Sequence, residues 1–335
     1  MSLYELHCPN CFSEDIKFGY QYNTKNHGSR TMFLCKACRF SFSETKKSFF
    51  QGLKKPISLI WQVLNARTEG MGLNAASRVY GISKNTIIDW ETKFTGLYKI
   101  LFIYSITSSF LELITEGDEF YTKIRKNVPQ EESAGWTIVL MDRASRFIWE
   151  LTCGKKDRKL FKKAIKTMQI LVNQTQDITL LTDGERRYGK FLFEVCHELI
   201  RTGKVGRPRK TLPKGVRVRV KNKGSQANKK GPKRPKYQAP LPEHPETVNT
   251  IENKEIHANH VEANNSAMRR KCSVFRRKTN TYAKSTTGLQ RILNVYWVMH
   301  NFMRTHFTTR KVPALALGLL KKRLTPKELF SIQYA

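Results

Sequence analysis

Three carboxylates stand where elements of secondary structure are expected to begin or end: Asp118, Asp183 and Glu262. The first two close segments that we expect to be strands, and strand ends in α/β sheets are where functional sites collect. Three carboxylates from distant segments can hold two divalent cations about 3.5–4 Å apart, and their hard oxygens suit Mg²⁺ or Mn²⁺. One such ion activates water or a 3′-hydroxyl, and the other stabilises the leaving oxygen at phosphorus. The three residues therefore predict two-metal chemistry at a phosphodiester.

Glu262 begins a strongly basic segment that we expect to be helical as far as Lys284. An apolar stripe at helical spacing, which should be buried, consists of Val261, Met268, Cys272 and Phe275. A polar stripe beside it consists of Glu262, Asn265, Arg269 and Arg276. In a metal site Glu262 stays ionised because the cations supply its counter-charge, while Arg269 and its neighbour Arg270 hold the DNA strand. The alternative is a solvated face on which Glu262 pairs with Arg269 or His260.

The chain of 335 residues has 60 Lys and Arg against 27 Asp and Glu, which gives a formal net charge of +33. Such a field attracts polyanions, and nucleic acid is the first candidate partner. An anionic membrane is the second, but the most apolar stretch, 97–114, is interrupted by Lys99 and is too short to span a bilayer. No basic-then-apolar signal opens the chain. We therefore expect a cytoplasmic, nucleoid-associated protein with reduced cysteines.

Four cysteines form two C-x-x-C pairs, Cys8 with Cys11 and Cys35 with Cys38. Each pair lets two thiolates reach one ion, and two pairs complete a tetrahedral Zn²⁺ site. The strand-like segments between the pairs favour a zinc ribbon. Four thiolates leave no open position for chemistry, so this zinc would be structural. A redox dithiol is the alternative. Core packing best explains the three scattered cysteines, Cys153, Cys196 and Cys272.

Residues 73–94 have the pattern of a helix-turn-helix. Gly81 supplies the turn, Ser83 can cap the second helix, and Ile87 and Trp90 would face the core. The exposed start of the recognition helix would then consist of Lys84, Asn85 and Thr86. An ordinary helical hairpin is the alternative, but a neighbouring zinc ribbon in a basic chain favours DNA binding.

Beyond residue 106 the hydrophobic pattern changes. Alternation predicts strands over 110–124 and 136–152, the second range broken into two by a turn. Helices are expected over 156–173 and 186–200, with a short buried strand over 177–184 between them. Three meandering strands followed by alternating helices and strands imply an α/β layered domain with a mixed sheet.

Residues 201–240 contain fifteen Lys and Arg and no acid. Such a composition cannot build a core, so we expect the segment to be largely disordered in isolation. Arg207 and Arg209 lie in "GRPRK", which resembles an AT-hook of the minor groove, although a general phosphate-binding loop is the stronger interpretation. The alternating "VRVRV" at 216–220 could form a strand when bound.

Together these segments resemble a bacterial insertion-sequence transposase, most closely the insertion-sequence-one family. Besides the cysteine pairs and the helix-turn-helix, the resemblance rests on "GDEFYTKI", "TDGERRYGKF" and "HVEANNSAMRRK". The last block is the most specific, because an acid-Asn-Asn run before an Arg-rich helix carries the family's third catalytic carboxylate. The resemblance covers almost the whole chain except 201–250.

The resemblance implies four parts: a zinc ribbon over 1–50, a helix-turn-helix domain over 51–105, an RNase H-like DDE catalytic domain over 106–305 with a flexible basic insertion at 201–250, and an extension over 306–335. It implies that Asp118, Asp183 and Glu262 are catalytic metal ligands for Mg²⁺ or Mn²⁺. A prokaryotic transposase of this kind would bind the double-stranded ends of its element, cleave them and join their 3′-hydroxyls to target DNA. Because two ends must be joined, a homodimer or higher oligomer is expected.

Two points remain open at this level. Glu119 adjoins Asp118, and a strand directs neighbours to opposite faces, so only one can reach the metals; we prefer Asp118 and keep Glu119 as the alternative. Asn265 and Arg269 would orient the scissile phosphate, whereas His257 and His260 are better explained as solvated or capping residues. The basic insertion is longer than the family's compact pattern, and a DNA clamp there is a hypothesis.

Two other functions compete with the transposase. A DNA-binding regulator or domesticated transposase would need the first 96 residues but has no use for three carboxylates at the ends of strands and helices. A nuclease for branched DNA on the same fold would not need a helix-turn-helix, because branches are recognised by shape. The part of the chain from 285 to 335 could pack on the catalytic domain or mediate assembly.

Overall fold

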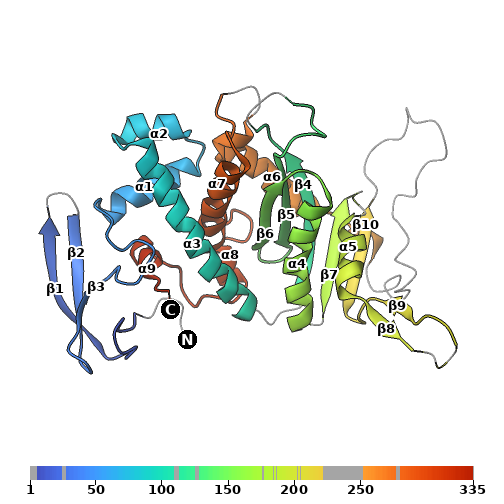
Figure 1. Cartoon of the computed structure of the whole chain (residues 1–335), viewed down its shortest axis with the longest axis horizontal. Helices are drawn as coiled ribbons and strands as arrows, with labels where there is room; N and C mark the ends of the chain where they lie inside the picture. The colour runs from blue at the N-terminus through green and yellow to red at the C-terminus, as the bar shows by residue number, and fades with distance from the viewer. Residues whose placement is uncertain are drawn as a thin grey trace.

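A mixed five-stranded sheet forms the centre of the structure, a computed structural model (Figure 1). Strands β4 (Leu113–Tyr121), β5 (Trp136–Asp142) and β6 (Ile148–Gly154) form an antiparallel meander. Strands β7 (Ile178–Asp183) and β10 (Val216–Lys221) extend it, with β7 parallel to β4 and β10 parallel to β7. The resulting order, β10-β7-β4-β5-β6, confirms the mixed sheet predicted from hydrophobic periodicity.

The structure describes most of the chain: residues 6–24, 28–108, 113–124, 128–175, 177–183, 185, 187–201, 203, 205–221, 252–276 and 280–334. The expected basic insertion lies outside these ranges from residue 222 to residue 250. No described helix is both long enough and apolar enough to cross a membrane.

Helices cover both faces of the sheet. The helices α4 (Arg158–Thr175) and α5 (Arg187–Cys196) lie on one face. The helices α6 (Asn259–Lys271) and α7 (Thr286–Val298) lie on the other, and α7 continues as a π-helix over Met299–Met303. Because consecutive strand residues point to opposite faces, each position on β4 is committed to one of these two pairs of helices.

The helix-turn-helix pattern corresponds to α1 (Ile57–Arg67), α2 (Leu73–Tyr80) and the long α3 (Lys84–Ser108). Gly81 ends α2 in the left-handed region at φ 63°, as its predicted role in the turn requires. Ser83 Oγ accepts the backbone N–H of Thr86 at 3.2 Å and caps α3 as predicted.

Helix α3 extends past the recognition region and packs along α7, as Figure 1 shows. Glu91 of α3 is fully buried and accepts hydrogen bonds from Arg67 of α1 at 2.8 Å and from Arg291 of α7 at 2.9 Å. One continuous hydrophobic core includes α1–α3, the sheet and the C-terminal helices. The expected recognition and catalytic segments therefore share a core.

The N-terminal cysteine region forms a small three-stranded sheet of β1 (Ile16–Thr24), β2 (Gly28–Cys35) and β3 (Ser41–Ser43). The chain ends in α8 (Pro313–Ala316) and α9 (Pro326–Ser331).

The C-terminal segment joins this small sheet to α1 and α3. The ring of Phe330 lies 4.2 Å from that of Phe50 and 5.7 Å from that of Phe94, measured between centroids. Lys327 Nζ lies 2.9 Å from a carboxylate oxygen of Glu44, and the Tyr334 N–H donates to the Lys47 carbonyl at 2.9 Å. Of the segment from 285 to 335, whose packing the sequence left undecided, α7 packs on β6 of the central sheet, and the last part packs against the small sheet and α1–α3.

The expectation that residues 201–240 build no core is wrong for β10 (Val216–Lys221), which the structure describes. Two short strands, β8 (Glu198–Ile200) and β9 (Arg209–Thr211), form a hairpin before β10. Val216 and Val218 of β10 are buried in the central sheet. The alternating "VRVRV" directs these valines inward, which a composition rich in basic residues conceals.

Two expected helices end early. The one predicted over 186–200 ends at Cys196, and the one predicted from Glu262 to Lys284 ends at Lys271. Cys272 is extended and begins a 3₁₀ turn over Ser273–Phe275. That turn keeps the apolar stripe buried, which is why the periodicity looked unbroken. Arg276 therefore lies beyond α6 and not on its polar face. A further 3₁₀ turn, Asn253–Glu255, precedes α6.

Glu150 provides a test of the packing of α4 on β6. Its buried carboxylate accepts a hydrogen bond from Thr167 Oγ1 at 2.6 Å, and burial raises its pKa to about 7. An unfolded Glu loses its proton near about 4.3, so between these values the folded state binds more protons and stability falls as pH rises. We expect Glu150→Gln, which is neutral at every pH, to exceed the parent in unfolding free energy by about 1–3 kcal/mol at pH 8.

Urea unfolding at pH 5 and pH 8 measures this difference, which should shrink at the lower pH. Glu198→Gln, at an exposed position, is the control and should show no such gap. An equal advantage of Glu150→Gln at both pH values would mean that ionisation of Glu150 is not its cause.

Candidate active site

Helix α6 lies along β4, and three contacts join them in the same order. The Val261 N–H donates to Glu116 Oε2 at 3.0 Å, Asn265 Nδ2 donates to Asp118 Oδ2 at 2.9 Å, and the Arg269 guanidinium lies 5.4 Å from the centroid of the Phe120 ring. Four helical residues advance about 6 Å and two strand residues about 6.6 Å, so the pairing repeats in step. Glu262 lies one turn before Asn265, and residues three apart share a helix face. The turn of α6 that contains Glu262 therefore lies between the contacts of Val261 and Asn265 with β4.

Asp183 lies on the strand next to Asp118. In the parallel pairing of β4 with β7, Gly117 is opposite Thr182, so Asp118 and Asp183 are the next residues along neighbouring strands. Residues opposite each other in adjacent strands point to the same face of a sheet. A Cβ added to Gly117 would lie 3.3 Å from Thr182 Cγ2, as a shared face requires. Asp183 therefore belongs to the α6 face, together with Asp118.

Glu119 points to the opposite face. Its carboxylate accepts hydrogen bonds from Lys156 Nζ at 2.6 Å and from the Tyr188 hydroxyl of α5 at 3.3 Å. Burial raises the pKa of Glu119, and Lys156 opposes that shift. Of the two acids that the sequence left open, Asp118 is the one on the face of α6.

Asn265 contributes a second polar atom to this face. The residue is 1% exposed, and while Nδ2 donates to Asp118, Oδ1 has no hydrogen-bond partner in the described part of the chain. Buried amide oxygens normally have one. An amide oxygen beside carboxylates is the kind of hard donor that Mg²⁺ and Mn²⁺ or their bound water accept. The donor set therefore fits a divalent cation.

Among the described residues, two groups have metal-ligand atoms that all lie within 4.8 Å of one another: the four N-terminal cysteines, and Glu116 with His257 and His260. Asp118, Asp183 and Glu262 are not gathered to this extent. A site for two ions about 3.5–4 Å apart spreads its ligands more widely than a site for one.

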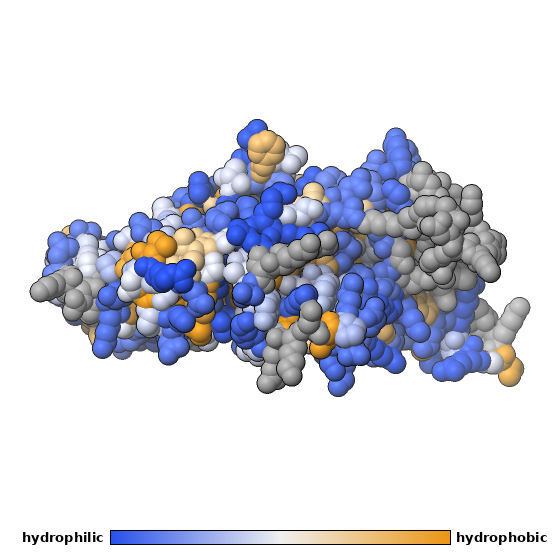
Figure 2. Space-filling view, turned by 90° about the horizontal axis from the view of Figure 1, so that it is seen from above, coloured by the Kyte–Doolittle hydropathy of each residue, from blue (hydrophilic) through white to orange (hydrophobic). Residues whose placement is uncertain are grey.

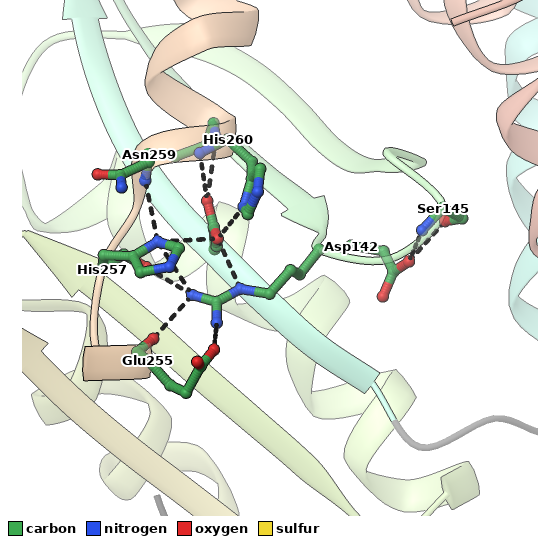
Figure 3. Close-up of polar contacts among 9 residues, drawn as sticks. Asp142, Ser145, Glu255, His257, Asn259 and His260 are labelled. Atoms are coloured by element: carbon green, nitrogen blue, oxygen red, sulfur yellow. Dashed lines mark hydrogen bonds and ion pairs between the residues drawn. The ribbon is translucent and has the colours of Figure 1, made fainter. Parts of the chain in front are cut away.

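Glu116, which the sequence analysis did not single out, is the most densely contacted acid near the site. Its side chain is fully buried and accepts Arg143 Nε at 2.7 Å, the His260 ring Nδ1 at 2.7 Å and the His260 N–H at 2.9 Å, besides Val261. The rings of His257 and His260, labelled in Figure 3, lie 5.4 Å apart between centroids. Arg143 also reaches Glu255 at 3.2 Å and the His257 carbonyl at 2.9 Å.

These contacts identify Glu116 as an anchor for the start of α6. A carboxylate at a helix N-terminus satisfies free backbone N–H groups and interacts favourably with the helix dipole. Burial alone would raise the pKa of Glu116, but hydrogen bonds from His260 and Val261 and the charge of Arg143 outweigh it and lower the pKa. Arg143 stands where a cation would approach this carboxylate. The backbone N–H and the ring of His260 both contact Glu116, whereas the ring of His257 lies 3.4 Å from the Asn259 N–H at the start of α6. The strand alternation that places Asp118 could have indicated Glu116 two residues earlier.

The four N-terminal cysteines converge as their spacing predicted. The Sγ atoms of Cys8 and Cys38 lie 3.5 Å apart, and those of Cys11 and Cys35 lie 3.6 Å apart. Zinc held tetrahedrally at about 2.3 Å from each sulfur requires sulfurs about 3.8 Å apart. Hydrogen bonds from the Asn10 side chain and the Phe40 N–H lower the pKa of the Cys38 thiol to about 6, whereas hydrogen bonds among the clustered thiols raise the pKa of Cys11. The geometry and donor set therefore fit Zn²⁺.

The residues predicted to bind DNA lie on separate surfaces. Lys84 and Asn85 are exposed at the start of α3, and Thr86 is half-buried there. Arg270 is exposed on α6 beside the half-buried Arg269. Arg207 precedes β9 and Arg209 begins it, in a hairpin at the opposite end of the molecule from the ribbon (Figure 1). Figure 2 shows a predominantly hydrophilic face along the length of the molecule, as the net charge requires.

No protein-family model and no curated protein matches the chain. Among solved structures, the chain is similar to the Mos1 mariner paired end complex with Mn, at 10% identity and a TM-score of 0.17 over 42% of this chain and 55% of that one. It is also similar to the Mos1 transposase paired-end complex with left transposon end, at 13% identity and a TM-score of 0.16 over 41% and 55%. The match spans about half of each of those chains. Likeness at these scores carries no weight for function, which the geometry of the site has to support by itself.

Replacement of Glu116 by Gln should release the start of α6. The amide would place a donor against N–H donors and leave Arg143 without its buried partner, so we expect a loss of about 3 kcal/mol in unfolding free energy. Glu255→Gln removes the half-exposed partner of the same arginine and should cost less than about 1 kcal/mol. Urea unfolding measures both, and equal losses would contradict the anchoring role.

Zinc content tests the cysteine cluster. We expect the purified parent to contain one zinc per chain, and Cys38→Ser to lose most of it because a serine hydroxyl is a poor zinc ligand. Cys196→Ser, outside the cluster, should keep the metal. Elemental analysis of the three proteins decides the matter, and equal zinc in all of them would exclude Cys38 as a ligand.

Proposed function

We propose that the chain is a DDE-type DNA transposase of RNase H-like fold, similar to the insertion-sequence-one family and acting in the prokaryotic cytoplasm. One observation carries the proposal: the Asn265–Asp118 hydrogen bond, which lays α6 along β4 and directs Glu262 toward Asp118. Asp183 joins them from the neighbouring strand. Carboxylates from two parallel strands and an anchored helix supply the ligands of a two-metal site.

In this proposal Asp118, Asp183 and Glu262 hold two Mg²⁺ or Mn²⁺ ions. Bound there, the ions supply an activated oxygen nucleophile and stabilise the leaving oxygen. Asn265 holds the Asp118 carboxylate in position through its amide. Arg269 and Arg270 bind phosphate oxygens of the DNA strand, since a guanidinium matches phosphate geometry.

Recognition and assembly belong to other parts of the chain. Lys84, Asn85 and Thr86 would enter the major groove at the element's ends, with the zinc ribbon alongside. Because α3 shares a core with the sheet, the recognised sequence would lie at a fixed distance from the cleaved bond. Joining two ends requires two active sites, so the protein would act as a homodimer or higher oligomer on DNA.

A strand-transfer assay tests the proposal, with a labelled duplex carrying the element's end, a target plasmid and Mg²⁺ or Mn²⁺. We expect Asp118→Asn and Glu262→Gln to lose joining by about 1,000-fold or more, because each removes a charge that the metals require. Glu119→Gln, the matched control on the opposite face, should retain joining. End binding should be unchanged in all three.

Other outcomes would overturn parts of this assignment. Equal joining by parent and Glu262→Gln would make Glu262 a surface acid. Loss of joining in Glu119→Gln but not in Asp118→Asn would exchange their roles. A parent that binds ends without cutting or joining them, with either metal, would be a DNA-binding regulator.

A further inference from the structure

The outer surface of α4 carries a row of lysines that the proposed chemistry does not use. Four of them are exposed and form no ion pair with the described part of the chain: Lys155, Lys159, Lys163 and Lys166. Of the other cations on α4, Arg158 and Lys162 share a single carboxylate, that of Glu194 of α5, so the three groups together keep a net positive charge. Helix α4 itself contains no acid, and the acid directly before it, Asp157, accepts the Leu160 N–H at 3.0 Å and caps its start.

This arrangement works against the stability of the helix. Arg158 and Lys159 occupy its first turn, where cations oppose the helix dipole at a cost of about 0.3–1 kcal/mol each. Lys159 and Lys163 are four residues apart, and like charges at that spacing repel by about 0.2–0.5 kcal/mol. Residues that lower the stability of their own helix or strand are often found at functional sites. A polyanion lying on this row would remove the repulsion.

The lysine row begins at the edge of the sheet that holds the candidate active site. Strands β4, β6 and β7 run in one direction, so β6 ends at Gly154 on the edge where β7 ends at Asp183. By register Gly154 is level with Tyr121, the last residue of β4, and Asp118 lies three residues before that end and not at the strand end expected from the sequence. Lys156, between β6 and α4, reaches Glu119 beside Asp118. From there the row runs along α4, away from that edge.

The row lies on the opposite face of the sheet from the recognition helix. Helix α4 packs on β6 from the side of α5, whereas α3 packs on α7, which covers the other side (Figure 1). A duplex bound at the start of α3 and one lying on α4 would therefore occupy different surfaces. The candidate metal site lies on the α6 face, so a duplex on α4 would reach it around the edge of the sheet where β4, β6 and β7 end.

We propose that Lys155, Lys159, Lys163 and Lys166 bind the phosphate backbone of the target duplex, the second DNA of the transposition reaction. The inference rests on the proposed function. From Lys159 to Lys166 the helix advances about 10 Å, the length of three base pairs at about 3.4 Å each. Lysine contacts to phosphate carry no base specificity, which suits a partner that varies in sequence.

The test compares two triple charge reversals that change the net charge equally. One is Lys159→Glu, Lys163→Glu and Lys166→Glu. The control is Lys311→Glu, Lys321→Glu and Arg323→Glu, at exposed positions near the C-terminus that form no ion pair in the described structure. Both should fold. In the α4 variant Lys159→Glu places an acid in the first turn, where it suits the helix dipole, and Lys162 gains partners of opposite charge at Lys159→Glu and Lys166→Glu, so this variant should melt close to the parent.

Three measurements distinguish the outcomes: affinity for a duplex without the element's end as salt is varied, affinity for the end, and joining to a target plasmid. We expect the α4 variant to lose about three units of the slope of log K against log salt on the unrelated duplex. It should also join at least tenfold less target, while its affinity for the end and its cleavage of the end equal those of the control.

An unchanged salt slope would overturn the proposal, and so would equal loss in the control. Equal loss of end binding would assign the row to the element's end. If the parent neither cleaves nor joins, the proposed function fails; an α4-specific change in slope would then show a non-specific DNA surface, and the target assignment would fall.

Discussion

A buried carboxylate, Glu116, determines how the two halves of the candidate site meet. The strand that carries Asp118 and the helix that carries Glu262 are far apart in sequence, and Glu116 joins them by accepting backbone N–H groups at the start of α6. Arg143 supplies the counter-charge that keeps this acid ionised away from water. Once the start of α6 is held there, helix and strand rises that nearly match carry Asn265 to Asp118.

The two faces of the central sheet carry different groups of charged residues. On the α6 face lie Asp118 and Asp183 from neighbouring parallel strands, and on the other face Glu119 pairs with Lys156 near the start of α4. Helix α3 extends from the turn after α2 to the packing against α7, where Glu91 unites α1, α3 and α7 in one buried ion network. The segments proposed for recognition and for chemistry therefore share one hydrophobic core with the sheet on which α4 and its lysines pack.

Much of this could be predicted because the signals are local. The turn at Gly81, the cap at Ser83 and the meander before α4 each depend on a few consecutive residues and on the period of side chains along a helix or strand. The cluster of four cysteines could be predicted for the same reason, since two thiols three residues apart in a tight turn can bind one metal ion. Strand alternation also predicted that Asp118 and Glu119 point to opposite faces of the sheet.

The sequence by itself determined the elements, the order of three carboxylates along the chain and the cysteine cluster, because these depend on short-range spacing. Only the tertiary structure decided which acid anchors α6, since Glu116 and Val261 are 145 residues apart. It likewise placed β10 in the core despite its charge and ended α6 at Lys271, where a 3₁₀ turn imitates helical periodicity. Such outcomes depend on partners brought together by folding, which no local pattern specifies.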